Sequence, residues 1–167
     1  AGAEETGEET DEEQPAAEST YEFLPSAEII LDGLEDMVAQ QKVYFLVDTL
    51  EYLQKGGRIS GTRAGLGKML SIKPILTMQN GEIEQLAQAR TKKKALARLS
   101  ALVADQAERE GAARICVMHS DALEDAQTLL EAIQSEMGIK NVPLYELPPA
   151  IVVHAGPGAL AVSFLGK

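Results

Sequence analysis

The feature that most constrains this chain lies near its C-terminus, where a tight turn of glycine and proline separates two apolar runs. The runs cover residues 150–153 and 159–165, and a histidine, His154, directly follows the first of them. Short apolar runs bounded by a turn are typical of buried strands. We therefore expect two extended segments, with His154 at a strand end, where its side chain can face a cleft.

The turn itself, Gly156-Pro157-Gly158, is suited to a close approach between the main chain and another group. Glycine tolerates positive φ and has no Cβ, whereas proline fixes its own φ and lacks an N–H donor. Successive N–H groups in such a turn can form a concave nest that binds an anion. A plain hairpin turn with a hydrogen-bonded histidine remains the alternative, because short glycine loops are common.

Charge divides the chain into an acidic segment and a nearly balanced remainder. Of the 167 residues, the first 22 include nine acidic and no basic residues, and the rest carry 15 basic and 17 acidic residues. We expect residues 1–25 to be a disordered tail or linker, because they bury too little apolar surface to offset chain entropy. Residues 26–167 are the expected domain. Its balanced charge argues against nucleic-acid binding, which needs a basic surplus.

Helical and strand patterns alternate along residues 26–167. Helices are expected from Ser26 to Lys42, packed on the core, and over residues 49–53, 60–70, 91–110 and 121–137. Further strands are expected over residues 43–47, 72–78, 82–86, 113–117 and 141–147. Asn80-Gly81 indicates a tight hairpin. This alternation with one hairpin predicts an α/β domain with a mixed sheet and flanking helices.

Few residues could support catalysis. The sequence has no phosphate-binding loop, dinucleotide fingerprint, zinc-site spacing or nucleophile elbow. The one cysteine, Cys116, lies in an apolar run, which predicts a buried, unreactive thiol compatible with the cytoplasm. No apolar run is long enough to cross a membrane. His154 and Arg58 suit the binding of a carboxylate, so we expect a binding protein with no cofactor or metal and no enzymatic activity.

Basic side chains form two exposed groups. Gly56-Gly57 predicts a helix stop, which would leave Arg58 on an exposed loop. Arg90, Lys92 and Lys93 lie at the start of a predicted helix, where positive charge opposes the helix dipole. That small cost favours a role in binding an anion or an acidic partner, although a solvated basic face is the alternative.

Two segments resemble the signatures of a known family. HAGPGAL, residues 154–160, resembles the C-terminal signature of the DegV family of bacterial lipid-binding proteins. DTLEYLQKGGRIS, residues 48–60, resembles the central signature of that family, and GKMLSIKPIL, residues 67–76, continues it. The resemblance covers about residues 26–167 and implies the C-terminal domain of such a protein.

The resemblance implies a ligand and a site. Proteins of this family are two-domain α/β proteins that hold one long-chain fatty acid in a tunnel between their domains. The histidine near the carboxylate matches His154, and its loop supplies Gly156, Gly158 and Ala159 to the same site. The arginine of the central signature matches Arg58, which is implied to contact the ligand or its phosphorylated head group.

The resemblance also implies a protein partner. Members of the family present the fatty acid to a fatty-acid kinase, which makes acyl-phosphate for phospholipid synthesis. The arginine before the basic helix matches Arg90, and together with Arg58, Lys92 and Lys93 it is implied to engage the kinase.

The sequence departs from the family pattern before residue 26. The Asp-Ser-Thr and Ser-Gly-Thr segments of the N-terminal domain, whose hydroxyls bind the carboxylate, are absent there. We therefore expect weak or no fatty-acid binding by this chain alone, and an exposed apolar patch where the absent domain would lie. One alternative is a protein-interaction domain that keeps the kinase-docking surface without a ligand. Another, a hydrolase or transferase with His154 as base, lacks a visible nucleophile.

Overall fold

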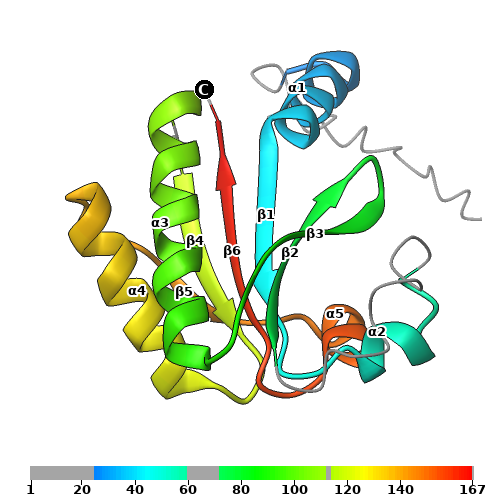
Figure 1. Ribbon diagram of the computed structural model, residues 1–167. Coiled ribbons are helices and arrows are strands. Elements are labelled where there is room, and N and C mark those ends of the chain that lie inside the picture. The colour runs from blue at the N-terminus through cyan, green and yellow to red at the C-terminus, as the bar shows by residue number, and fades with distance from the viewer. Residues whose placement is uncertain (1–24, 60–71, 112–113, 167) are drawn as a thin grey trace, which may run out of the picture.

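The computed structural model describes residues 25–59, 72–111 and 114–166, and within them a six-stranded sheet forms the centre of the fold (Figure 1). The strand order is β3-β2-β1-β6-β4-β5, and all neighbours are antiparallel except the parallel pair β4 and β5. The strands are β1 Gln41–Leu46, β2 Lys73–Gln79, β3 Glu82–Ala89, β4 Arg114–His119, β5 Leu144–Glu146 and β6 Leu160–Leu165. The predicted mixed sheet is confirmed. The predicted acidic tail, up to residue 24, and the predicted helix over 60–70 lie outside the described residues.

The described helices largely follow their sequence signals. They are α1 Ala27–Gln40, α2 Glu51–Lys55, α3 Lys92–Glu110, α4 Leu123–Met137 and α5 Pro149–Ala155. The Ser26 hydroxyl accepts a bond from the Ile29 amide at 3.4 Å, and the Thr91 hydroxyl accepts one from the Lys94 amide at 3.3 Å, as expected of N-caps. Gly138 ends α4 in the left-handed conformation.

The hairpin between β2 and β3 is confirmed at the predicted residues. Asn80 has φ 51° and Gly81 has φ 80°, and two successive positive φ values characterise the tight turns that match strand twist. The return strand β3 is longer than predicted and reaches Ala89. A register shift at Ile75 and Leu76 interrupts the pairing of β2 with β3.

The two faces of the sheet differ in what covers them. Helices α3 and α4 lie on one face, as Figure 1 shows, and the main core lies between them and the sheet. Its fully buried side chains include Leu46, Leu99, Val103, Val117, Leu129, Ile133 and Phe164. A smaller apolar cluster, which contains Val47, Leu53, Leu76, Leu147, Ala155, Ala159 and Ala161, joins the opposite face to α2 and α5.

The expected strand over residues 150–153 is wrong, because these residues form the helix α5. Two prolines precede the run, and proline is favoured in the first turn of a helix, where its missing N–H costs nothing. The Pro148 carbonyl accepts bonds from the amides of Ile151 at 2.8 Å and Val152 at 3.1 Å. His154 therefore lies in the last turn of a helix and not at a strand end.

The expected packing of α1 on the core is also wrong. Helix α1 has no buried residue, and its six large apolar side chains are 44–72% exposed: Ile29, Ile30, Leu31, Leu34, Met37 and Val38. In Figure 1 this helix stands at the end of the sheet away from α2 and α5. An exposed apolar surface of the expected kind is therefore present on α1, whereas what covers it stays a prediction.

Candidate functional site

One end of the sheet collects both signature segments. Strands β1 and β4 are each antiparallel to β6, so they run in the same direction and their carboxyl ends lie at the same edge. Helices α2 and α5 and the first turns of α3 and α4 lie at this end (Figure 1). Carboxyl ends of neighbouring strands are a common place for ligand sites in α/β sheets.

Two aromatic rings pack on glycines of the opposite signature. A Cβ atom added to Gly56 would lie 2.2 Å from Nδ1 of His154, and one added to Gly156 would lie 2.3 Å from Cδ2 of Tyr52. Both distances are far shorter than van der Waals contact, so any other residue would displace the ring. Each signature thus contributes one ring and one glycine to a reciprocal contact between α2 and the end of α5.

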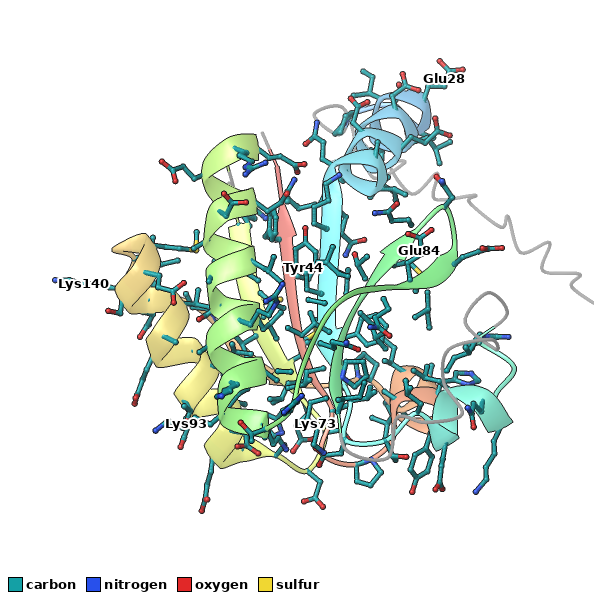
Figure 2. The ribbon with its side chains drawn as sticks, in the orientation of Figure 1. Glu28, Tyr44, Lys73, Glu84, Lys93 and Lys140 are labelled. Atoms are coloured by element: carbon teal, nitrogen blue, oxygen red, sulfur yellow. The ribbon has the colours of Figure 1, made fainter. Side chains whose placement is uncertain are left out.

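A carboxylate makes the third contact between the signatures. A Cβ atom added to Gly158 would lie 2.1 Å from Oδ2 of Asp48. Nζ of Lys73 lies 2.9 Å from Oδ1 of Asp48, and Nζ of Lys92 lies 3.3 Å from Oδ2 and 2.7 Å from Asp125. This ion-pair network links the loop after β1 to the first residues of β2 and α3 and to the first turn of α4. Figure 2 shows Lys73 at this end of the sheet.

The network shifts the ionisation of its members. Burial alone would raise the pKa of the Asp48 carboxyl, but the hydrogen bond from Lys73 and the charges of Lys92 and Lys73 outweigh burial and lower this pKa. Burial alone would lower the pKa of the Lys92 ammonium, but the hydrogen bond to Asp125 and the charges of Asp48 and Asp125 raise it. Both groups are therefore held in their charged forms.

The glycine loop does not form the anion nest that its sequence permits. The Gly156 amide donates to the Val152 carbonyl at 2.8 Å, and the Gly158 amide donates to the Ser120 carbonyl at 2.7 Å. Both glycine amides are therefore already used inside the chain, and the intervening proline has no N–H to offer. The glycines act instead by allowing close packing of side chains on the loop. Ala159 is fully buried in the smaller apolar cluster, so its side chain does not reach the surface.

His154 is half-buried at this end of the sheet, and one of its nitrogens is enclosed. Its Nδ1 is buried against Gly56 and has no hydrogen-bond partner among the described residues. Nε2 is therefore the nitrogen of this ring that is left to meet a ligand.

The expected partner-binding cations divide into two kinds. Arg58, Arg90 and Lys93 are exposed. The Arg58 amide donates to the Leu53 carbonyl at 2.9 Å, so the chain leaves α2 in a defined direction. Lys92 is only 25% exposed at its side chain, and its ammonium is already paired with two carboxylates inside the chain. Lys92 therefore belongs to the network and is not a free surface charge.

Sequence reasoning did not identify Asp48, Tyr52 and Lys73 as members of the site. All three lie in the segments that carry the family resemblance, and Tyr52 precedes Gly56 by one helical turn. That spacing was a usable signal, since it places a ring and a glycine on the same face of α2. The partners of Asp48 come from distant segments, which no local pattern could have shown.

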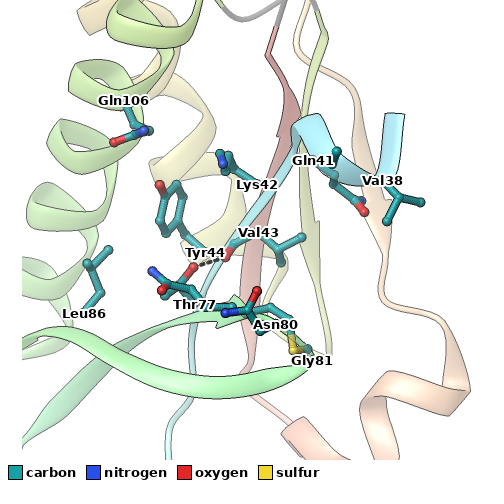
Figure 3. Close-up of a pocket in the computed structure, with 13 residues that line it drawn as sticks. Val38, Gln41, Lys42, Val43, Tyr44, Thr77, Asn80, Gly81, Leu86 and Gln106 are labelled. Atoms are coloured by element: carbon teal, nitrogen blue, oxygen red, sulfur yellow. Dashed lines mark hydrogen bonds between the residues drawn. The ribbon is translucent and has the colours of Figure 1, made fainter. Parts of the chain in front are cut away.

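Hollows also lie away from the signatures, among them two that border α1. One, of about 710 Å³, lies between α1, the β2–β3 hairpin and α3, and Figure 3 shows Tyr44, Gln106 and Lys42 around it. The second, of about 400 Å³, lies between α1 and the sheet and includes Cys116 in its lining. Burial raises the pKa of the Cys116 thiol by more than a hydrogen bond with the Ser163 backbone lowers it. A raised pKa fits an unreactive cysteine. We locate the site at the signatures, where polar side chains converge from several elements.

The described residues also give no sign of a membrane helix or a metal site. None of the described helices is both long enough and apolar enough to span a bilayer. Among the same residues, no three histidine, cysteine or acidic side chains are grouped as metal ligands.

Comparison with known proteins identifies the family. The model of the DegV family, described as uncharacterised proteins, matches residues 24–167. The chain belongs to the DegV family. A DegV domain-containing protein of Clostridium perfringens is 40% identical over 124 residues, which are 74% of this chain and 43% of that protein. The chain spans about half the length of the curated DegV relatives it matches.

Solved DegV structures share the fold. The fatty acid binding DegV protein of Streptococcus agalactiae superposes with a TM-score of 0.75 at 30% identity, over 85% of this chain and 50% of that one. A DegV protein of Ruminococcus gnavus, described with vaccenic acid, superposes with a TM-score of 0.73 at 27% identity, over 83% of this chain and 50% of that one. The mixed α/β sheet with flanking helices is thus a DegV fold.

We predict that Asp48→Asn lowers the stability of this DegV chain in a pH-dependent manner. The pKa of Asp48 is lowered from 3.8, so its carboxylate stabilises the fold above pH 3.8, and this contribution is lost as the pH falls through the folded-state pKa. Because the side chain is 37% exposed, the loss at pH 7 should not exceed about 1 kcal/mol. Urea denaturation at pH 7 and at pH values below 3.8 measures it.

Asp105→Asn is the matched control, because Asp105 also pairs with a cation, Arg109, at 3.0 Å but is 56% exposed. It should cost about 0.5 kcal/mol or less at pH 7. A stability difference between wild type and Asp48→Asn that is the same at pH 7 and in acid would contradict the prediction.

Proposed function

We propose that this chain forms one wall of a site for a long-chain fatty acid, and that the protein carries the acid in the cytoplasm to a fatty-acid kinase. The observation that carries the proposal is a histidine donor placed beside exposed apolar side chains. The chain would act as part of a carrier and would not itself catalyse a reaction. Two solved relatives support this choice of ligand. The DegV protein of Streptococcus agalactiae is described as fatty acid binding, and that of Ruminococcus gnavus is described with vaccenic acid.

The apolar wall is the face of the sheet opposite α3 and α4. The strand register places Phe45 and Met118 on either side of Ala161 on this face. On the adjoining helix α5, Ile151 is 48% and Val153 is 64% exposed, next to His154. A carboxylate at Nε2 of His154 with its acyl chain on this face would satisfy both parts of a fatty acid.

A single wall gives only part of the binding energy. Each CH₂ group contributes about 0.8 kcal/mol when it is fully removed from water, and an open face leaves one side of the acyl chain hydrated. The domains proposed are therefore a DegV C-terminal domain over residues 26–167 and a second domain that supplies the opposite wall. Joining this chain to the part of the Clostridium perfringens relative that it does not match gives what we call the completed protein.

We predict that His154→Ala weakens the binding of a long-chain fatty acid by the completed protein about tenfold or more, because a hydrogen bond to a charged group is lost. Binding of the methyl ester should change less than twofold, since the ester has no carboxylate. Val153→Ala is the matched control and should weaken acid and ester equally. Calorimetric titration of wild type and both variants with the acid and with the ester measures this, and unchanged acid affinity in His154→Ala would remove His154 from the site.

Exposed cations favour a docking surface for the kinase. Arg58, Arg90 and Lys93 are exposed around the same end of the sheet as His154, so a bound partner could reach the carboxylate. The alternative function, an interaction domain that docks the kinase without holding a ligand, uses the same side chains. Lipid extraction from the purified completed protein separates the two, because only the carrier releases a fatty acid.

We predict that Arg58→Ala leaves fatty-acid affinity within about twofold and lowers the rate of acyl-phosphate formation with a fatty-acid kinase about tenfold, as expected when a docking charge is lost. Arg109→Ala, an exposed arginine at the far end of α3, should change neither quantity. If fatty-acid affinity collapses in Arg58→Ala, Arg58 contacts the ligand and not the kinase.

A further inference from the structure

We propose that Asp48 is a positioning residue for His154. In this inference, which rests on the proposed function, the carboxylate fixes the glycine loop after α5 and thereby fixes the imidazole that meets the ligand. Asp48 follows β1, far from His154 in sequence, and would act without touching the fatty acid.

The first step of the argument is the contact between Asp48 and the loop. Oδ2 of Asp48 occupies the space that a side chain on Gly158 would need, at 2.1 Å from an added Cβ. On its other side, the Gly158 amide donates to the Ser120 carbonyl at 2.7 Å, and the Ser120 amide donates to the Ala159 carbonyl at 2.9 Å. The loop is therefore held between the end of β4 and the Asp48 carboxylate.

The second step is what holds Asp48 in place. Nζ of Lys73 donates to Oδ1 of Asp48 at 2.9 Å and to the main-chain oxygen of Asp48 at 3.1 Å, so one ammonium holds both the carboxylate and the backbone of this residue. Nζ of Lys92 contacts the other oxygen, Oδ2, at 3.3 Å and is itself held by Asp125 at 2.7 Å. Each carboxylate oxygen thus accepts from a different lysine, and the carboxylate plane is set.

The third step is the path from Gly158 to His154. Only three residues separate them, and Gly156 in between is covered by the Tyr52 ring. The His154 ring in turn lies on Gly56 at the end of α2. Residues 48–56 and residues 154–158 thus touch at three successive points, and we expect a shift of the loop at Gly158 to change the position of the His154 ring relative to α2.

Replacing Asp48 by asparagine removes the charge of the side chain but keeps its shape. The asparagine side chain has nearly the same size as aspartate but offers one oxygen and one NH₂ group, which cannot accept a hydrogen bond. Either orientation of the amide places NH₂ against the ammonium of Lys73 or of Lys92. Asp48→Asn should therefore release the carboxylate network while it leaves the contact volume at Gly158 unchanged.

The test is a double-mutant cycle on fatty-acid affinity in the completed protein. Asp48→Asn should weaken binding about fivefold in the wild-type background and less than twofold in the His154→Ala background, because Asp48 acts through His154. A general structural effect would weaken binding equally in both backgrounds and would overturn the proposal, as would an unchanged affinity in the first. Asp105→Asn should leave affinity unchanged in both backgrounds.

A second measurement needs no ligand. The chain has two histidines, so a spectrum of histidine-labelled protein shows two imidazole rings, and His154→Ala assigns them. Asp48→Asn should shift the His154 ring signals of this chain, and Asp105→Asn should not. Shifted signals in a protein that binds no fatty acid would reject the proposed function and keep the positioning role. Unshifted signals in a protein that binds fatty acid normally would reject the positioning role and keep the proposed function.

Discussion

The contact between α2 and the loop after α5 is the interaction on which the rest of the site depends. It brings together two segments about a hundred residues apart, and it does so through three glycines whose missing Cβ atoms leave room for His154, Tyr52 and Asp48. Since each contact uses a glycine on one segment and a side chain on the other, neither segment can move independently. The role proposed for His154 follows from this packing, because the packing encloses Nδ1 and leaves Nε2 to meet a ligand.

The second constraint is the unequal cover of the sheet. Helices α3 and α4 bury one face in a continuous core, whereas among the described residues the opposite face carries the smaller cluster with α2 and α5. The exposed apolar residues of α1 and α5 add to that surface, and the chain spans about half the length of its curated DegV relatives. Both observations fit the proposal that this domain supplies one wall of the fatty-acid site.

Much of the fold could be predicted from local signals, and the failures have physical reasons. Asn80-Gly81 specified its hairpin because few residues tolerate two positive φ values, and Ser26 and Thr91 specified helix starts through their hydroxyls. The apolar run before His154 is too short for its periodicity to distinguish a strand from a helix. It forms a helix because the prolines ahead of it favour a helix start. Helix α1 was expected to pack because it is amphipathic, yet amphipathic residues show only that a helix needs a partner.

The sequence predicted which residues form the site better than it predicted what those residues do. Family resemblance led to His154 and Arg58, but the roles of Asp48 and Lys92 depend on partners from β2, α3 and α4, which only the folded chain brings together. The glycine turn could have formed an anion nest, but its two glycine amides donate to the Val152 and Ser120 carbonyls instead.

Native mass spectrometry tests most directly whether this chain supplies only one wall of a fatty-acid site. The chain expressed alone and the completed protein would be purified from the same host and then denatured to release any bound lipid. We predict that the chain alone is empty and that the completed protein carries one fatty acid per molecule. One fatty acid on the chain alone would contradict the account, because the site would then be complete without a second wall.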